Sequence, residues 1–382
     1  MEIYLDNSAT TAAYPECGEL VYSVMTKGYG NPSSLHRKGI EAEKEVKTAA
    51  KRIAAALNAN EKEIFFLSGG TEADNLAILG TADAKRGRHI ITSDIEHPAV
   101  LNTVEYLEKK GYDISYVPVD RNGRCIVKEF ERLIRKDTIL VSIMLVNNEI
   151  GTIQPVKEMS DILKRKNKNA LFHVDAVQGF GKIPFTAASL GADMITLSSH
   201  KIHGPKGVGA LYIKSGTNIN PIIHGGGQQG NMRSGTEDVS GIAGFGLAAE
   251  IALTDLKEKA SRMMWLKARL RDGIIREIPE ISVNTPYENS APHILNVSFR
   301  GAKSEVILHT LENDGIYVSS GSACSSHKNA PSYVLTAIGL PMELIDGSIR
   351  FSLSEFTTQE EIDYTLKKLK AAVFGIRKVM RR

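Results

Sequence analysis

Short apolar runs that end in polar clusters recur along the first two-thirds of the chain. Three of them, 64–67, 170–174 and 194–197, are each followed by a cluster rich in Ser, Gly, Asp or His. Such runs are typical of strands buried in a parallel sheet. Segments with apolar residues at helical spacing, such as 98–110, lie between them. The alternation predicts an α/β fold with a mostly parallel sheet.

The pattern changes from about Leu256. A long charged helix is predicted over 256–278, and short strands at 294–299 and 348–353 precede a final helix. We interpret this part as a second, smaller α/β domain. The chain end is basic, which predicts a solvated helix end. Its charged residues are Arg377, Lys378, Arg381 and Arg382.

Composition narrows the class of protein. The length of 382 residues favours two domains. The chain has 47 basic and 44 acidic side chains, and the resulting net charge of +3 gives no reason to expect a nucleic-acid or membrane surface. The N-terminus lacks the pattern of a signal peptide, and no run approaches the ~18 apolar residues of a membrane span. Three widely spaced cysteines, Cys17, Cys125 and Cys324, form no metal-binding pattern and favour a reducing cytoplasm.

Polar residues at the strand ends are candidates for ligand binding, because open α/β sheets bind ligands beyond the carboxyl ends of their strands. Lys201 could form a Schiff base, with a surface lysine in a turn as the alternative. Asp175 could pair with a pyridine nitrogen or could cap a helix. The turn 69–71 could bind a phosphate through its backbone N–H groups or be a plain glycine turn. Together these are the residue types that a pyridoxal phosphate (PLP) site requires.

Three further residues could carry chemistry. His97 could stack on a flat cofactor or move protons, whereas a histidine before proline more often ends a strand. Arg350 could clamp a carboxylate with two hydrogen bonds, with a solvent-facing arginine as the equal alternative. Cys324 lies among Ser, Gly, Asn and Pro, which is typical of an exposed loop and favours a reactive thiol. Cys17 and Cys125 lack such surroundings and are expected to be structural.

Segments that contain these candidate residues, taken in their order along the chain, resemble one family. From residue 4 to about 358 the chain resembles the cysteine desulfurases of the NifS/IscS type, within the class V aminotransferase family of fold-type I PLP enzymes. SSHKIHGPKG around Lys201 and SSGSACSS around Cys324 are its most specific segments. The other matching segments are YLDNSATT, YGNPSSLH, FFLSGGTEADNLAI, ITSDIEHPAV, LVSIMLVNNEIGTIQP, HVDAVQGFGKIPF, HGGG with MRSGTEDV, ILNVSF and SIRFSLSEFTT.

The resemblance implies the aspartate aminotransferase-like fold of PLP-dependent transferases. A large PLP-binding domain with the mostly parallel sheet would span 14–257. A smaller α/β domain would comprise 1–13 and 258–382, and it would carry a mobile cysteine loop at about 319–332.

The resemblance also assigns roles residue by residue. Lys201 would form the Schiff base and move the Cα proton of the substrate, and His97 would stack on the ring and act as acid or base. Asn148 and Arg350 would hold the substrate carboxylate, and Cys324 would accept sulfur. The remaining cofactor contacts would be Asp175 at the pyridinium, Gln178 at the ring hydroxyl, Asn148, and, at the phosphate, Gly70, Thr71, Ser198, His200 and Thr236 from a second subunit.

The implied reaction takes sulfur from L-cysteine to Cys324 and leaves alanine and an enzyme persulfide. The implied partners are a second copy of the chain, since a homodimer would share its sites, and a sulfur-acceptor or scaffold protein. Iron–sulfur assembly and the thiolation of tRNA or cofactors are the candidate destinations of the sulfur. Cys324 could also ligate an iron–sulfur cluster transiently in a complex.

One segment departs from the family pattern. The family usually has Glu-Arg-Gly after the glycine triplet, where this chain has Gln229, Gly230 and Asn231. The departure puts local loop order, the dimer contact and turnover in doubt, and it is the only support for a non-catalytic partner protein on the same fold. An aminotransferase or a selenocysteine lyase is the nearer alternative, and either would need Lys201 but not Cys324.

Overall fold

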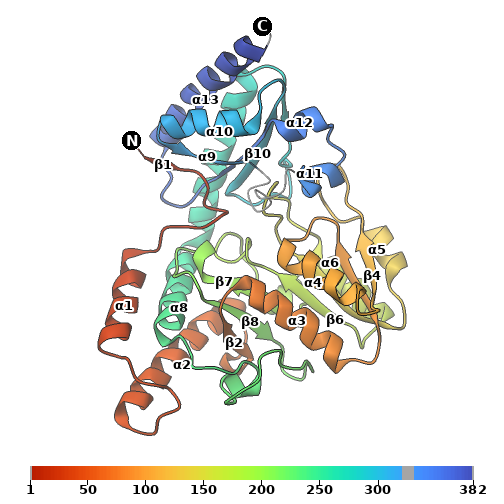
Figure 1. Ribbon diagram of the computed structural model, residues 1–382, viewed down its shortest axis with the longest axis vertical. Helices are drawn as coiled ribbons and strands as arrows, with labels where there is room; N and C mark the ends of the chain where they lie inside the picture. Colours follow the sequence, from red (N-terminus) through yellow and green to blue (C-terminus); the bar gives the residue numbers. More distant parts are fainter. Residues whose placement is uncertain (1, 321–330, 381–382) are drawn as a thin grey trace.

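The computed structural model describes residues 2–320 and 331–380, and they form two lobes stacked along the long axis (Figure 1). The lower, large lobe is built on a seven-stranded sheet, and the upper, small lobe contains both chain ends (Figure 1). The domain bounds expected at 13/14 and 257/258 stay predictions.

The large lobe contains a sheet with the strand order β2-β8-β7-β6-β5-β3-β4. The strands in this order are β2 (Ile64–Leu67), β8 (Gly209–Ile213), β7 (Met194–Ser198), β6 (Leu171–Asp175), β5 (Thr138–Met144), β3 (His89–Ser93) and β4 (Asp113–Val117). Its α-helices are α1 (Pro15–Thr26), α2 (Arg37–Leu57), α3 (Gly70–Ala84), α4 (Pro98–Glu108), α5 (Val127–Leu133), α6 (Val156–Lys166), α7 (Ala187–Leu190) and α8 (Val239–Leu253). Three 3₁₀ turns are η1 (Glu61–Glu63), η2 (Ser199–Lys201) and η3 (Gln229–Asn231).

The pairing of this sheet is mostly parallel, as the sequence predicts. β7, β6, β5, β3 and β4 pair in parallel, whereas β8 is antiparallel to both of its neighbours. The expectation that 64–67 pairs in parallel is wrong, because β2 is an edge strand paired only with the antiparallel β8. β2 nevertheless runs in the same direction as β7, so its carboxyl end lies at the same edge of the sheet.

Apolar side chains cover both faces of the sheet. On one face Phe172 of β6 packs in a core that includes Phe245 of α8. On the other face Leu171 packs in a core that includes Ile78 of α3. Each such fully buried side chain contributes about 1.5–3 kcal/mol relative to an exposed one. Burial on both faces explains why the strands read as continuous apolar runs.

The small lobe has a four-stranded antiparallel sheet of order β12-β13-β10-β9 and a parallel pair of β1 with β11. The strands are β1 (Ile3–Tyr4), β9 (Ile281–Val283), β10 (Ile294–Phe299), β11 (Ile316–Tyr317), β12 (Ser319–Ser320) and β13 (Ser348–Ser352). The helices are α9 (Leu256–Glu277), α10 (Ser304–Asn313), α11 (Tyr333–Ala337), α12 (Met342–Asp346) and α13 (Gln359–Met380).

The N-terminal segment passes from the small lobe to the large lobe (Figure 1). The Asn7 amide donates to the Ser352 carbonyl at 2.9 Å in the small lobe, and the Thr11 hydroxyl donates to the His200 carbonyl at 3.0 Å in the large lobe. Residues 5–11 therefore lie where the two lobes meet.

The basic end of α13 differs from the expected solvated helix end. Arg377 is only 7% exposed, and its guanidinium donates to the carbonyls of Arg300, Pro279 and Glu280 at 2.8–3.0 Å. Arg377 therefore fixes the helix to the lobe, whereas Lys378 is exposed. Arg381 and Arg382 lie outside the described residues.

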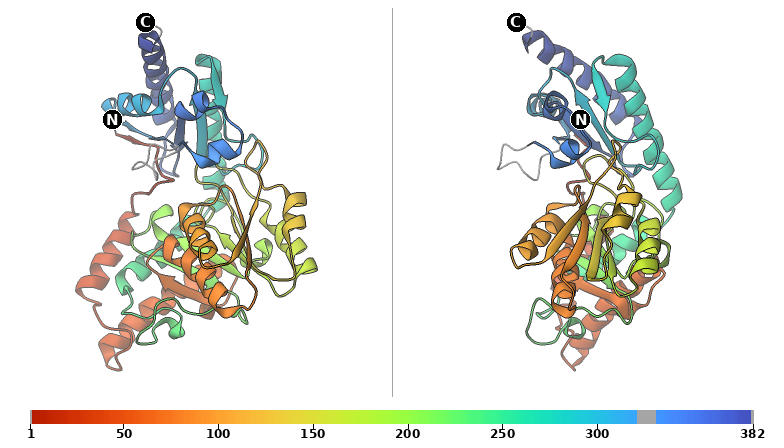
Figure 2. Two further views of the ribbon diagram at one scale, coloured as in Figure 1. Left: turned by 45° about the vertical axis from the view of Figure 1, so that its right-hand side comes forward. Right: turned by 90° about the vertical axis from the view of Figure 1, so that its right-hand side faces the viewer.

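Within the described part of the chain, no single helix has the length and apolar character to cross a membrane. Only the consecutive helices α8 and α9, bent by 72° where they meet, satisfy both criteria when they are taken as a pair. Figure 2 shows α9 rising from the large lobe along the side of the small lobe.

Candidate active site

Side chains at the ends of β6 and β7 form what we call the strand-end rim: Asp175, Ser198 and Lys201. Asp175 ends β6, Ser198 ends β7, and Lys201 ends the turn η2 that follows directly. Asp175 lies opposite Thr196 of β7 in the parallel register, which brings the two strand ends together. The Lys201 ammonium donates to the carbonyls of Ser8 and Ala9 at 2.6 and 2.8 Å, so the lysine points inward rather than into solvent.

Asp175 is a buried carboxylate with a limited set of partners. Its Oδ1 accepts a hydrogen bond from the Val177 N–H at 2.9 Å, which closes a local turn, and no α-helix begins there. Burial raises the pKa of Asp175 to about 6, although the Val177 hydrogen bond and the charge of Lys201 act in the opposite direction. A cationic partner would therefore be strongly favoured beside this carboxylate.

A second buried carboxyl group lies behind Asp175. Asp74 of α3 is 1% exposed, and burial raises its pKa well above the ordinary value, with the Asp175 charge acting in the same direction. The buried His173 ring contacts Ser142 and Thr196 at 2.9 Å, and burial lowers its pKa to about 3. Two neighbouring buried carboxyls do not ionise together easily, so the charge of either one favours the protonated form of the other.

The turn after β2 has the geometry of an anion site. Gly69 caps α3 without a side-chain hydrogen bond, so it leaves N–H groups of the first helical turn unoccupied by a cap. A Cβ on Gly70 would lie 3.0 Å from Val177 and 3.7 Å from the Cβ of Ser198. The turn therefore lies against the strand-end rim, and a larger residue at 70 would fill the space between them.

Thr71 and His97 line one cavity of about 380 Å³ at the N-terminal ends of α3 and α4. His97 is the N-cap of α4 and accepts a hydrogen bond on Nδ1 from the Ala99 N–H at 3.1 Å. Burial and the charge of Lys201 lower the pKa of His97 to about 4. The ring is therefore neutral near pH 7 and carries its proton on Nε2.

Gln178 and His200 lie close to the N-terminal segment. The Gln178 amide donates to the Ser8 carbonyl at 2.9 Å, and its oxygen is 3.4 Å from Nε2 of His293. His200 Nδ1 is 3.1 Å from the Thr10 hydroxyl. Burial, together with the charges of Lys201 and Lys206, lowers the pKa of His200 to about 4.

Arg350, Asp6 and Asn148 form what we call the interlobe clamp. Arg350 of β13 is 5% exposed, so the alternative of a solvent-facing arginine is wrong. Its guanidinium forms an ion pair with Asp6 at 2.7 Å and donates to the Asn148 carbonyl at 2.8 Å. Among the described residues, Nε of Arg350 and Oδ1 of Asn148 are buried polar atoms without a hydrogen-bond partner. The Nε–H of Arg350 is thus a donor available to a ligand with a carboxylate, whereas Oδ1 of Asn148 can accept only from a ligand donor.

Two predicted residues lie apart from this centre or outside the described residues. Thr236 is exposed and lines a separate cavity of about 160 Å³ that also contains Ser68 and Gln229. Cys324 lies in 321–330, outside the described residues. Cys17 and Cys125 are buried free cysteines, and burial raises the pKa of the Cys17 thiol to about 11.

The segment 229–231, which departs from the family pattern, is held by specific contacts. The Gln229 side chain accepts a hydrogen bond from the Phe66 N–H on the edge strand β2 at 2.8 Å and donates to Glu237. Gln229, Gly230 and Asn231 all have positive φ, between 49° and 67°. Asparagine and glycine tolerate this conformation well, so two of the three residues suit the turn.

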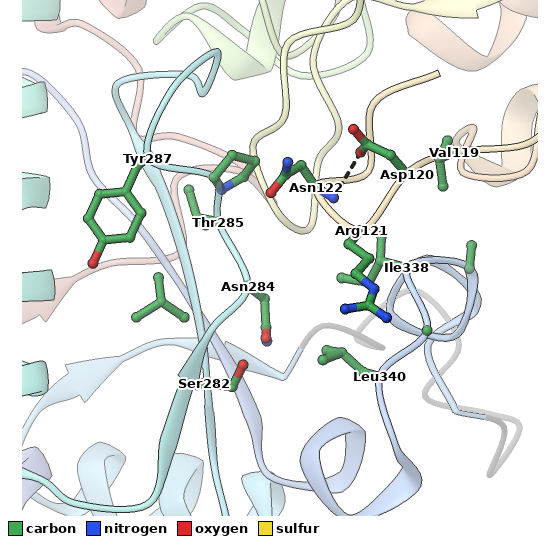
Figure 3. Close-up of a pocket in the computed structure, with 14 residues that line it drawn as sticks. Val119, Asp120, Arg121, Asn122, Ser282, Asn284, Thr285, Tyr287, Ile338 and Leu340 are labelled. Atoms are coloured by element: carbon green, nitrogen blue, oxygen red, sulfur yellow. Dashed lines mark hydrogen bonds between the residues drawn. The ribbon is translucent and has the colours of Figure 1, made fainter. Parts of the chain in front are cut away.

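A further cavity, of about 780 Å³, opens between the lobes (Figure 3). Its walls are the turn 119–122, the segment 282–287 and the end of α11 at 337–340. The Arg121 side chain points into the space between these walls (Figure 3). None of the predicted site residues lines this cavity. Within the described part of the chain, no group of three or more His, Cys, Asp or Glu side chains could hold a metal.

Sequence reasoning missed several residues that complete the site. Asp6 holds Arg350, Ser8 accepts from both Lys201 and Gln178 through its carbonyl, and Glu149 follows Asn148 directly. The family match of the segment YLDNSATT is a signal that these residues belong to the site. The sequence does not show their individual contacts.

A buried carboxylate that ends β6 and an inward-pointing lysine just after β7 lie at the edge of the sheet where α/β enzymes bind their ligands. The chain belongs to the aminotransferase class-V family, whose model matches residues 3–365. It is 46% identical to the cysteine desulfurase IscS of Dictyoglomus turgidum, over 99% of this chain and 96% of that protein. The cysteine desulfurase IscS of Methanosarcina thermophila is 45% identical over 98% of this chain and 93% of its own length.

Solved structures agree with this assignment. A NifS-like protein superposes with a TM-score of 0.92 at 44% identity, covering 97% of this chain and 99% of that one. The structure of SspA in complex with cysteine superposes with a TM-score of 0.82 at 33% identity, covering 93% and 100%. The predicted fold class, a large mostly parallel α/β sheet with a smaller α/β part, is confirmed.

Proposed function

We propose that this chain is a cysteine desulfurase that uses PLP to move sulfur from L-cysteine to Cys324, with L-alanine as the second product. Near full-length identity of 43–46% to proteins named cysteine desulfurase is the observation that carries the proposal. The arrangement of the strand-end rim beside the interlobe clamp supports it independently.

The described side chains fit PLP. The cradle beside Gly70, which a Cβ would fill, suits a phosphate, and Thr71, Ser198 and His200 surround it in this proposal. Asp175 would face the pyridine nitrogen with the oxygen that Val177 leaves available. His97 would stack on the ring, Gln178 would exchange its bond to Ser8 for the ring hydroxyl, and Thr236 would reach the phosphate of a partner subunit.

When bound, PLP would supply an electron sink for bonds broken at the substrate Cα and Cβ. Arg350 would hold the substrate carboxylate by donating from Nε, which lacks a partner among the described residues, and Asn148 would donate to it from its side-chain amide N–H. Nζ of Lys201 would hold the cofactor and would accept the proton that leaves the substrate Cα. His97 would give or take a proton at Nε2, because its Nδ1 accepts from Ala99.

The sulfur step requires an attacking thiolate. The Cys324 thiolate would attack the substrate sulfur, forming an S–S bond while the substrate Cβ–S bond breaks. The electron pair returns to carbon, which is protonated to give the methyl group of alanine, and the persulfide stays on Cys324. A thiolate of this kind persists in a reducing compartment, so we propose a cytoplasmic location.

Replacement of Cys324 tests the reaction type. We expect the purified holoprotein to form alanine and sulfide from L-cysteine in the presence of a reductant, and we expect the Cys324→Ala variant to lose sulfide release. Amino-group transfer to a keto acid that persists in Cys324→Ala would instead identify an aminotransferase. Sulfide release that needs no Cys324 would also contradict the proposal, and a protein that binds no PLP would be a non-catalytic partner.

The assembly and the destination of the sulfur are further parts of the proposal. A homodimer would place Thr236 of one subunit at the phosphate of the other, and analytical ultracentrifugation tests it. The acceptor or scaffold protein would be identified by transfer of labelled sulfur from the Cys324 persulfide to candidate proteins.

A further inference from the structure

Helix α11 begins immediately after the segment that contains Cys324, and its first residues are tied to the large lobe. The Ser332 hydroxyl donates to Oε2 of Glu149 at 2.6 Å and accepts the Leu335 N–H at 3.1 Å as the N-cap of α11. Ser332 is 5% exposed and Glu149 is 4% exposed. The first helix after residues 321–330 is thus held by a buried hydrogen bond to a carboxyl group.

The apolar side of α11 packs on the same lobe. Val334 and Leu335 form a cluster with Ile95, Met144 and Ile150, all of which belong to the large lobe. The Tyr333 hydroxyl also donates to the carbonyl of Glu96 at 2.6 Å. The far end of α11 forms a wall of the interlobe cavity, where Ile338 is visible beside Arg121 (Figure 3). α11 therefore has its packing contacts on the lobe that carries Lys201.

The strand that precedes the same segment is attached to the interlobe clamp. Ser319 of β12 pairs with Arg350 of β13 in antiparallel register. Glu149 follows Asn148, whose carbonyl accepts from Arg350 at 2.8 Å. The described residues on the two sides of 321–330 are thus attached beside Arg350 and at Glu149, which is one residue from another member of the clamp.

Glu149 is electrostatically linked to Arg350. Burial raises the pKa of Glu149 to about 7, while the Ser332 hydrogen bond and the Arg350 charge act to lower it. Arg350 is shared with Asp6, so the charged groups that face this region are one guanidinium and two carboxylates. An ionised Glu149 depends on Ser332 for the direct hydrogen bond that offsets its burial.

We propose that Glu149 is a positioning residue that acts through Ser332: its carboxyl group holds α11 beside the interlobe clamp and so fixes the position of the chain directly after the segment that contains Cys324. The inference rests on the proposed desulfurase function and deepens it. Its consequence is that Glu149 and Ser332 serve the sulfur-transfer step, whereas Arg350 and Lys201 serve substrate binding and the chemistry at Cα.

Two variants test the pair, with one control on the same helix. We expect Glu149→Gln and Ser332→Ala to slow persulfide formation on Cys324 in a single turnover about tenfold to a hundredfold, the range of a hydrogen bond to a charged group. The Kd for L-cysteine, measured from the colour change of bound PLP, should stay within about twofold. Thr336→Ala removes a bond to the Ser332 carbonyl on the same helix and should leave both values unchanged.

The pH profile separates positioning from a general loss of structure. Because the pKa of Glu149 is about 7, the rate ratio of wild type to Glu149→Gln should grow as pH rises through 7. Ser332→Thr, which keeps the hydroxyl, should restore the wild-type rate.

Three outcomes would overturn the inference: unchanged transfer rates in both variants, a Kd for L-cysteine that weakens in parallel with the rate, or equal losses at all pH values. A wild-type protein that forms no persulfide would contradict the proposed function itself, and the inference would fall with it.

Discussion

The strand-end rim and the interlobe clamp are built in opposite ways. The rim lies at the ends of two hydrogen-bonded neighbouring strands, β6 and β7, so one sheet fixes the positions of Asp175 and Lys201. The clamp joins Arg350 to Asp6, 344 positions away in the chain, and to the Asn148 carbonyl, 202 positions away. In the proposed reaction, the cofactor would thus bind to a rigid platform, while substrate recognition would depend on how the two lobes meet.

This difference also explains which parts of the site could be predicted. Strands buried on both faces leave continuous apolar runs, and polar residues directly after such runs mark the rim, so Asp175 and Lys201 were found from local pattern. No local pattern pairs Asp6 with Arg350, because ion-pair partners distant in sequence leave no periodic signal. For Arg350, the sequence leaves a carboxylate-binding side chain and a solvent-facing side chain equally open.

The largest expected effect concerns the rim. Lys201→Ala should lower kcat/KM for L-cysteine by about a thousandfold or more, because no other group in the proposal replaces its amine as both imine former and base. Lys214→Ala, an exposed lysine after β8, is the matched control and should keep full activity. The measurement is alanine formation with PLP in excess. A residual rate within tenfold of wild type would contradict the catalytic role proposed for Lys201.

The clamp should respond differently. Arg350→Lys should lower kcat/KM about tenfold to a hundredfold, mainly by raising KM, because lysine cannot reproduce the planar, two-point contact. Asp6→Asn should have a smaller effect in the same direction. In a double-mutant cycle the two changes should couple by about 0.5–3 kcal/mol, whereas additive effects would show that Asp6 does not orient Arg350.

A pH-dependent effect distinguishes the large-lobe interior from the clamp. Burial raises the pKa of Glu96 to about 8, and one of its oxygens lacks a partner among the described residues. The folded protein then keeps a proton that the unfolded chain releases above about 4.5, so this group costs stability as pH rises from about 4.5 to about 8. Glu96→Gln should therefore raise the Tm relative to wild type. This difference in Tm should grow by ~2 °C or more as the pH rises from 5 to 8.

The control for this prediction is substrate affinity. Glu96→Gln should leave the KM for L-cysteine unchanged, since Glu96 belongs to neither the rim nor the clamp. A Tm difference that is the same at pH 5 and pH 8 would show that Glu96 is ionised in the folded protein throughout this range.

The smallest expected effect concerns the segment 229–231, which departs from the family pattern. Gln229→Ala removes the hydrogen bond to the Phe66 N–H and should lower the free energy of unfolding by about 1 kcal/mol. Gln228→Ala removes a bond to the Gly235 N–H within the loop and serves as the matched control. Denaturant unfolding measures both, and a larger loss in Gln228→Ala would contradict the role assigned to Gln229.

Two other features of the fold could not be predicted from the sequence, and each has a physical reason. The direction of pairing leaves no mark on an apolar run, so the antiparallel pairing of β2 with β8 could not be read from residues 64–67. The burial of Arg377 depends on backbone carbonyls of Pro279, Glu280 and Arg300, whose orientation no side-chain pattern records.

Borohydride reduction of the purified holoprotein, followed by peptide mass spectrometry, shows whether Lys201 carries the cofactor. One pyridoxyl group should be covalently fixed on the Lys201 amine and absent from Lys214. A pyridoxyl group on another lysine, or none on any peptide of a protein that has bound PLP, would contradict this role of Lys201.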